Sequence, residues 1–265
     1  MTETTAPILL DVDSGVARLR LNRPHASNAL DLATLKALHE AVVACHGDPR
    51  VRAVLLSGEG PNFCAGGDVR DFAAKGEHLP DYLRQATAYL QAAASALIHL
   101  TAPVVTVVQG WATGGGGFGL VCASDLVLAA ESARFLLGAT RVGMAPDGGV
   151  SVTLQHLVGH RRALEIALTN PVLDARRALE IGLVTRVVPD ATLLDEGLAL
   201  ARELAAGPTR ALGATKRLLW TGLGAAVEQC LADEARTVSE LSGTADAREG
   251  LAAVIERRAP RFTGR

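Results

Sequence analysis

The chain has 265 residues, a formal net charge of -2 and 49% hydrophobic residues. This length and composition predict one large domain or two small ones with a substantial core, and they exclude a disordered or fibrous chain. Charges of both signs are dispersed without a block of like charge, so we expect neither nucleic acid nor an anionic membrane as a partner.

The cysteines and the N-terminus indicate a cytoplasmic protein. Four cysteines are scattered without CxxC spacing, which is typical of small core residues in a reducing compartment. The polar first residues show no signal-peptide pattern. The stretch 85–124 lacks charged residues, but Pro103, Gln109 and a glycine run make it a poor membrane segment.

Apolar alternation and turn residues give the expected elements in chain order. A hairpin around Ser14-Gly15 opens the chain, and Asp31 is a plausible N-cap for the first helix. Strands are predicted at 8–12, 16–21, 51–56, 104–108, 125–130 and 183–188. Helices are predicted after Asp31, around Val69 and Phe72, at 81–100, at 150–158, from about 161, at 174–180, and at 194–206, 209–221, 224–241 and 245–258.

The order of these elements divides the chain into two regions. Strands mixed with helices predict an α/β core over residues 1–193. Residues 194–265 are helical throughout and carry wide apolar faces. Such faces either fold onto the core or are shared with another subunit.

Four consecutive glycines, Gly114 to Gly117, lie between two predicted buried strands. Glycine brings bare backbone N–H groups close to a ligand, so we interpret the run as a backbone-donor site, with tight packing as the alternative. The run also matches the dinucleotide fingerprint. A run of glycines matches that pattern trivially, however, and the segment before Asp125 is too short for the crossover helix that the fingerprint needs.

The segment 63–68, Phe-Cys-Ala-Gly-Gly-Asp, is a second strand-to-helix turn. Its free N–H groups and those of the glycine run could hold one oxyanion between them. The alternative is an ordinary loop in which Asp68 caps a helix.

Asp147 follows an apolar stretch and precedes Gly148 and Gly149. Desolvation would raise its pKa and suit it to proton transfer, whereas spacing alone favours an N-cap for the helix that ends near 158. His156 and His160 have the i, i+4 spacing of metal ligands, but no HExxH pattern accompanies them and Gly159 is expected to end the helix between them. We therefore expect no metal site.

Nearly end to end, the chain resembles the crotonase superfamily, the enoyl-CoA hydratases and isomerases. Each motif is a moderate signal, and their shared order and spacing make a strong one. The motifs are Asn22-Arg23-Pro24 with Asn28-Ala29-Leu30, residues 63–68, 110–125, 146–149 and 178–184, and the tail Asp246-Ala-Arg-Glu-Gly250 with residues 256–264.

The resemblance implies a core of ββα turns wound into a spiral and a C-terminal helical region that builds trimers, often paired into hexamers. It implies an acyl-CoA thioester as ligand and no cofactor beyond the CoA of the substrate. The thioester oxygen would lie between the N–H groups of Gly67 and of Gly115 or Gly116, since counting from either end of this longer glycine run gives a different residue. The implied CoA contacts are His25, Ala26, Ala65, Gly66, Asp68 and Arg257.

Departures from the family pattern bear on the reaction. The two glutamates that hydratases of this family use map to Gly119, or Phe118 by the other count, and to Ala139. None of these side chains can move a proton. Asp147 matches the acid of the isomerase branch, which includes the ring-epoxide isomerase of phenylacetate breakdown.

The resemblance therefore favours an enoyl-CoA isomerase that uses Asp147 as its acid–base group. Two alternatives stay open. One is a hydratase or another acyl-CoA hydrolase or lyase that uses an unidentified acid, with Asp68, Asp71 and Glu77 nearest in sequence. The other is a catalytically weak acyl-CoA-binding protein.

Overall fold

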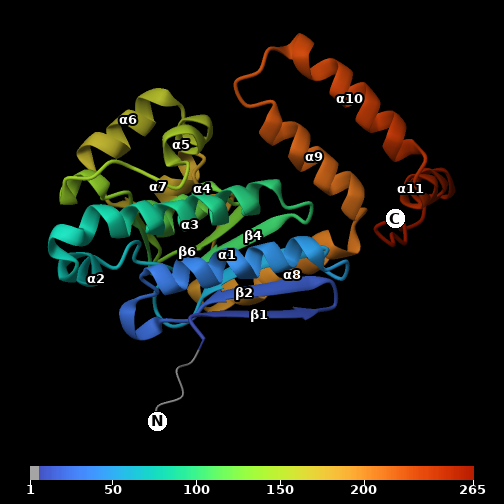
Figure 1. Ribbon diagram of the computed structural model, residues 1–265. Coiled ribbons are helices and arrows are strands. Elements are labelled where there is room, and N and C mark those ends of the chain that lie inside the picture. The colour runs from blue at the N-terminus through green and yellow to red at the C-terminus, as the bar shows by residue number, and fades with distance from the viewer. Residues whose placement is uncertain (1–5) are drawn as a thin grey trace.

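A six-stranded sheet is the largest element of the computed structural model, which describes residues 6–265 (Figure 1). The first two strands form an antiparallel hairpin around Ser14-Gly15, as predicted, and every later neighbouring pair in the sheet is parallel. In sheet order the strands are β1 (Ile8–Asp13), β2 (Val16–Leu21), β3 (Ala53–Gly58), β4 (Val104–Val108), β6 (Leu126–Ala130) and β9 (Arg186–Val188).

A second, three-stranded sheet was not predicted. It consists of β5 (Trp111–Thr113), β7 (Arg134–Leu136) and β8 (Leu173–Asp174), in the order β5-β7-β8. Strands of two or three residues are too short to show the alternation by which strands are recognised in a sequence.

The two sheets are linked by a repeated path of the chain. Two turns of the chain, β4-β5-α4 and β6-β7-α5, each give one strand to the large sheet, one strand to the small sheet and then a helix. A third turn begins with β3. In the turn after β3, Cys64 takes the place of the second strand through a bridge to Ala112. This is the ββα spiral that the resemblance implies.

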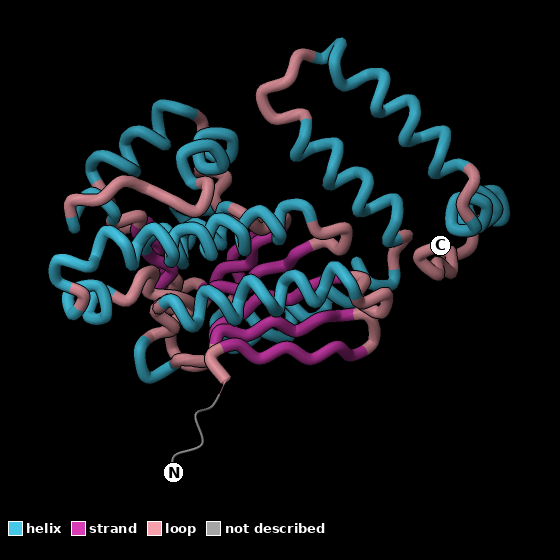
Figure 2. The backbone as a smooth tube through the Cα atoms, in the orientation of Figure 1, coloured by secondary structure: helices cyan, strands magenta, loops and turns pink. Residues whose placement is uncertain are grey.

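The helices with predicted bounds start and end close to those positions, whereas no bounds were predicted for α4. Figure 2 shows how the helices lie around the strands. The Asp31 side chain caps α1 by accepting from Thr34 N at 2.8 Å, and Asp174 caps α7 in the same way. The helices are α1 (Leu32–Gly47), α2 (Val69–Ala74), α3 (Leu79–His99), α4 (Gly114–Cys122), α5 (Val150–Val158), α6 (His160–Thr169), α7 (Ala175–Glu180), α8 (Leu193–Ala206), α9 (Thr209–Thr221), α10 (Val227–Ser242) and α11 (Ala245–Glu256).

The helices of the C-terminal region differ in how they contact the core. Helix α8 packs against β3 and β4, so the boundary expected at residue 193 does not separate this helix from the core. Helices α9–α11 extend away from the sheets (Figure 1). Helix α9 is anchored by Lys216, whose buried ammonium contacts Asp125 Oδ2 at 2.7 Å and Leu97 O at 2.8 Å.

Three phenylalanines fix the segments from which the site is built. Phe63, Phe118 and Phe135 are fully buried, and they lie at the start of segment 63–68, in α4 and in β7. Burying each such side chain contributes about 1.5–3 kcal/mol relative to leaving it exposed. No helix within residues 6–265 is long and apolar enough to cross a membrane.

Candidate active site

Segment 63–68 is held on one side by β5. Cys64 N donates to Trp111 O at 2.9 Å, and Thr113 N donates to Cys64 O at 2.9 Å. The Thr113 hydroxyl adds a bond of 2.6 Å to Ala65 O. Because β5 runs directly into α4, these bonds also hold the start of α4, with its four glycines, beside segment 63–68.

On its other side the segment pairs with Leu30. Leu30 N donates to Gly66 O at 2.7 Å, and Asp68 N donates to Leu30 O at 3.1 Å. Gly67 lies between these two bonds and takes part in neither, so in this parallel bridge its N–H points away from Leu30. Gly67 lines the cavity described below, and its N–H has no backbone acceptor within residues 6–265.

Gly66 makes the close approach of the segment and α4 possible. Its φ is +83°, a conformation that side chains rarely adopt, and a Cβ there would lie 2.6 Å from Thr113 O. A larger residue would therefore push segment 63–68 away from the first turn of α4.

Helix α4 begins with the glycines themselves. We had expected a glycine loop that opens a helix, but Gly114 is already its first residue and Thr113 its N-cap. The first N–H groups of a helix have no acceptor within it and carry its partial positive charge, so Gly114, Gly115 and Gly116 present unpaired donors. A Cβ on Gly114 would lie 3.7 Å from Gly67 N, which puts the two donor sets side by side.

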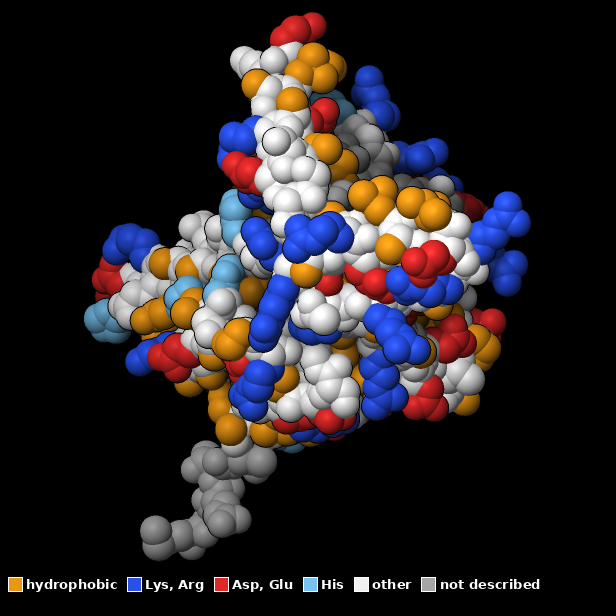
Figure 3. Space-filling view, turned by 90° about the vertical axis from the view of Figure 1, so that its right-hand side faces the viewer, with side chains coloured by type: hydrophobic (Ala, Val, Ile, Leu, Met, Phe, Trp, Pro, Cys, Tyr) orange, Lys and Arg blue, Asp and Glu red, His pale blue; other side chains and the backbone are white. Residues whose placement is uncertain are grey.

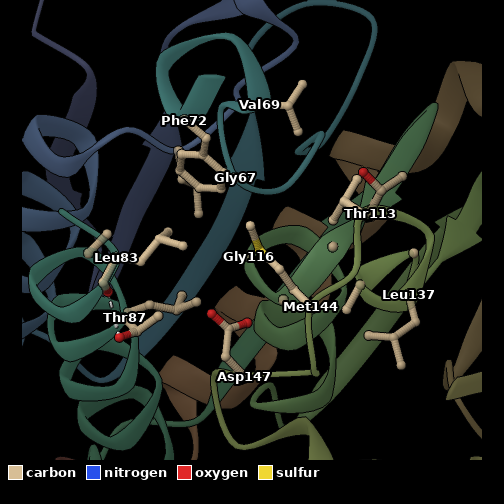
Figure 4. A pocket seen from close by; sticks show the side chains of 18 of the residues that line it. Gly67, Val69, Phe72, Leu83, Thr87, Thr113, Gly116, Leu137, Met144 and Asp147 are labelled. Atoms are coloured by element: carbon tan, nitrogen blue, oxygen red, sulfur yellow. Dashed lines mark hydrogen bonds between the residues drawn. The ribbon is translucent and has the colours of Figure 1, made fainter. Parts of the chain in front are cut away.

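These donors open into a cavity of about 460 Å³ (Figure 4). Its wall is mainly apolar and comes from α2, α3, α4 and the segment that carries Met144 and Asp147. Among the lining residues in the described part of the chain, Asp147 is the only acid. The other lining residues are Leu30, Leu35, Ala65, Gly67, Val69, Phe72, Leu83, Ala86, Thr87, Leu90, Thr113, Gly114, Gly115, Gly116, Leu136, Leu137, Gly138, Ala139, Arg141, Val142, Met144 and Ala145.

Asp147 does not cap the following helix, so the N-cap interpretation is wrong. The N-cap of α5 is Gly149, at a φ of +84°, and no side chain caps this helix. The positive φ values of Gly148 and Gly149 turn the chain between Asp147 and α5, which leaves the carboxylate free to face the cavity. The backbone O of Asp147 accepts from Val150 N of α5 at 3.2 Å.

The Asp147 carboxylate lies against the first turn of α4. A Cβ on Gly115 would fall 1.4 Å from Asp147 Oδ1, so only glycine leaves room for the carboxylate here. Burial raises the pKa of Asp147 above its usual range, and its own backbone N–H partly opposes that shift. A desolvated carboxylate with a raised pKa is suited to taking and returning a proton.

The residues expected to contact CoA are only partly brought together. Ala65 lines the cavity, and its N–H donates to Ser27 O at 2.9 Å, next to the 3-10 turn η1 (Pro24–Ala26) that carries His25 and Ala26. We call Ala65, Ser27 and this turn the rim of the cavity. His25 is exposed there. Arg257 is exposed at the end of α11, outside the cavity.

The three acids nearest in sequence to segment 63–68, which were the alternative candidates for a catalytic acid, do not line the cavity. Asp68 caps α2 by accepting from Asp71 N at 3.2 Å, and it pairs with Arg23 at 3.3 Å. Asp71 forms an ion pair of 2.6 Å with Lys75, which lowers its pKa. Glu77 is exposed in the 3-10 turn η2 (Gly76–His78).

The positions of the family's glutamates border the site. Ala139 lines the cavity. A Cβ on Gly119 would meet Val150 Cγ2 at 3.4 Å and Asp147 O at 3.9 Å, whereas Phe118 is fully buried in the core. Of the two candidate positions in α4, Gly119 is therefore the one directed at the segment that carries Asp147.

The two histidines with metal-ligand spacing lie on separate helices. Helix α5 ends at Val158 with Gly159 as its C-cap, as predicted, and His160 starts α6. His160 Nδ1 is 3.0 Å from Gln155 Oε1.

Sequence reasoning missed the residue that holds the loops at the rim. Asn28 adopts a φ of +55°, accepts from Arg23 N at 2.8 Å, and donates to the carbonyls of Glu59 and Asn62 at 2.9 and 2.8 Å. Asparagine tolerates the left-handed region better than most residues, so Asn28 within its motif was the available signal.

A ββα spiral in which two sets of backbone donors and one carboxylate meet at an apolar cavity is the crotonase fold with its site. The chain belongs to the enoyl-CoA hydratase/isomerase family, whose model matches residues 11–265. It is 38% identical to the "Probable enoyl-CoA hydratase" of Rhodobacter capsulatus, over 97% of this chain and 98% of that protein.

Two further relatives differ in their named activities. The chain is 35% identical to the 1,2-epoxyphenylacetyl-CoA isomerase of Escherichia coli, over 97% of this chain and 98% of that one. The crystal structure of an enoyl-CoA hydratase from Bacillus anthracis matches with a TM-score of 0.92 at 31% identity, and the match covers 98% of this chain and 100% of that one. Hydratase and isomerase names thus both occur among close relatives.

Proposed function

We propose that this protein shifts a double bond in an enoyl-CoA through an enolate. The observation that carries the proposal is that Asp147 is the one acid lining the cavity within the described chain, against the first turn of α4, whose backbone donors lie beside that of Gly67. The epoxyphenylacetyl-CoA isomerase of Escherichia coli, which also acts on an acyl-CoA, supports the choice.

In this mechanism Asp147 removes a proton from the carbon between the thioester carbonyl and the double bond of a 3-enoyl-CoA. The electron pair moves onto the thioester oxygen, whose negative charge is held by the N–H groups of Gly67 and of Gly115 or Gly116. Asp147 then returns the proton to the far carbon of the original double bond, which gives the 2-enoyl-CoA. One such donor contributes about 3 kcal/mol to lowering the barrier, or more than a hundredfold in rate.

The apolar wall of the cavity suits the acyl group, and CoA reaches the site as part of the substrate. We assign the CoA moiety to the rim at Ala65, Gly66 and the turn of His25 and Ala26, with a phosphate on Arg257. Asp68 contributes there by holding α2 and Arg23 in place.

Arg257 reaches this CoA only if another copy of the chain supplies it, because its own α11 lies far from α2 and α3 (Figure 1), which line the cavity. We propose a homo-oligomer, a trimer or a hexamer, built on α9–α11. Large hydrophobic side chains there are strongly exposed, including Leu219 at 71%, Val254 at 79% and Ile255 at 80%. Figure 3 shows this side of the molecule, where hydrophobic side chains lie beside Lys and Arg. Sedimentation of a Val254→Asp/Ile255→Asp variant tests this, and an unchanged mass would count against it.

The test of the reaction is the conversion of 3-enoyl-CoA to the conjugated 2-enoyl-CoA, followed by its absorbance. Asp147→Asn should abolish conversion and leave CoA affinity nearly unchanged. Asp71→Asn is the matched control, because Asp71 is an acid near the site that does not line the cavity. Normal turnover by Asp147→Asn would show that another group moves the proton.

A hydratase is the second candidate, since the relative from Rhodobacter capsulatus carries that name. Steady hydration of crotonyl-CoA by the wild type, without a double-bond shift, would favour it. Acyl-CoA binding without any turnover would favour a catalytically weak binding protein.

A further inference from the structure

Asp147 borders a second cavity besides the one that suits the acyl group. This second cavity has a volume of about 420 Å³ and lies between the C-terminal half of α3 and residues 146–151. Asp147 lines both cavities, whereas Leu90 lines only the first and Gly148 only the second. A Cβ on Gly148 would lie 3.4 Å from Leu90 Cδ2, so these two residues form the partition beside the carboxylate.

The two cavities differ in the side chains that α3 presents to them. Thr87 lies in the first cavity, and Gln91, Ser95 and His99 lie in the second. These four polar residues are spaced four apart, so they form one stripe along the helix. We call them the polar stripe of α3. Toward its C-terminal end the stripe reaches the surface, because Gln91, Ser95 and His99 are all exposed.

The stripe offers hydrogen-bonding groups to water next to Asp147. Ser95 Oγ is 3.4 Å from His99 Nδ1, and that nitrogen is 2.8 Å from Ser95 O, which leaves the other ring nitrogen of His99 free of these contacts. Ser151 adds a hydroxyl from α5 on the opposite wall. Because this cavity reaches the surface and carries several hydrogen-bonding groups, water can enter it.

We propose that Asp147 exchanges its proton with bulk water through the second cavity, along the polar stripe of α3, while the substrate fills the first. The inference rests on the proposed double-bond shift. After Asp147 has taken a proton from carbon, its carboxyl O–H gives that proton to a water in the second cavity, and a proton from solvent replaces it. The net proton count of the reaction is unchanged, but the proton delivered to the far carbon comes from solvent.

The experiment is turnover of a 3-enoyl-CoA in D₂O, with the deuterium content of the 2-enoyl-CoA product read by mass spectrometry. We expect the wild type to introduce close to one deuterium per product molecule. Filling the second cavity with Gln91→Leu/Ser95→Leu should lower this incorporation severalfold, while the rate of the double-bond shift stays within about twofold. Gln85→Leu is the matched control, because Gln85 is exposed on α3 and lines neither cavity.

Two outcomes overturn the inference. A wild type that shifts the bond without incorporating deuterium returns the abstracted proton and leaves the proposed function standing. Equal incorporation by the wild type and the filled variant shows that solvent enters by another way.

A second substrate separates the inference from the proposed function. A saturated acyl-CoA exchanges the hydrogens next to its thioester with D₂O if Asp147 forms the enolate, without any double bond to move. Exchange that the filled variant slows, in an enzyme that shifts no enoyl-CoA, would support the route through the second cavity and refute the isomerase.

Discussion

Replacing Gly115 with alanine places a methyl group where the Asp147 carboxylate now lies. The backbone tolerates the change, because Gly115 does not have a positive φ and alanine favours a helix by about 1 kcal/mol over glycine. The new Cβ would nevertheless fall 1.4 Å from Asp147 Oδ1, and an ordinary contact needs roughly 2 Å more. The carboxylate must therefore leave its position, or the first turn of α4 must move with its donors.

A displacement of about 1 Å in a catalytic group costs on the order of a hundredfold in rate, so Gly115→Ala should lower kcat for the double-bond shift at least that far. The free energy of unfolding of Gly115→Ala should change by less than the activation free energy of the reaction does. The assay is the initial rate of 2-enoyl-CoA formation, run beside thermal unfolding and CoA binding.

The same helix supplies a control. In Gly119→Ala the Cβ comes no closer than 3.4 Å to any neighbour, so this variant has the same gain in helix propensity without the collision. It should keep most of the activity. Gly115→Ala with more than a tenth of wild-type kcat would refute the reasoning. A Gly115→Ala/Asp147→Ala double variant should regain any stability that the single Gly115 change loses, because the clashing carboxylate is gone.

Other changes follow from contacts described above. Gly66→Ala forces a side chain into a φ of +83° and against Thr113 O, so urea unfolding should show a loss of about 2 kcal/mol, and wild-type stability would contradict this. The raised pKa of Asp147 means that kcat/KM falls as acidification protonates this base. Protonation also favours the fold, an advantage present in full below the unfolded pKa and lost as pH rises through the folded pKa. Asp147→Asn should thus stabilise the fold at neutral pH, seen as a Tm difference that shrinks on acidification, and a constant difference would argue against it. Lys216→Met leaves the partly buried Asp125 without its cation and should cost about 3 kcal/mol in urea unfolding. A Lys216→Met/Asp125→Asn variant should recover most of this loss, and wild-type stability of Lys216→Met alone would contradict the prediction.

Elements with a local signal were predicted well. The Asp31 and Asp174 caps, the hairpin and the long helices all depend on residues close to one another in sequence. The strands of the small sheet were missed because two or three residues carry too little pattern, and their pairing joins segments far apart in the chain.

The site shows the same division between local and distant information. The residues around Asp147 are compatible with either a cap or a free acid, and the spacing favoured the cap. What excludes the cap is the pair of positive φ values at Gly148 and Gly149, together with the contact to Gly115, 32 positions earlier. The resemblance to a family favoured the catalytic acid, but it did not exclude the cap. That Leu83 and Thr87 line the cavity could not be predicted from the sequence, because it depends on how α3 packs against the rest of the fold.

The position of segment 63–68 between two partners sets the order in which the molecule becomes active during folding. Its bonds to Leu30 are available once α1 and β3 have formed, but its other partner, β5, comes after the whole of α3 and β4. Pairings between residues so distant in sequence form late, because the loop between them must first be closed. The large sheet meets the same condition, because β3 and β4 pair across a similar separation, so Gly67 takes its place beside α4 as this sheet closes. Refolding chains should therefore regain their helix signal first, and the pairing that holds Gly67 should return together with the sheet signal.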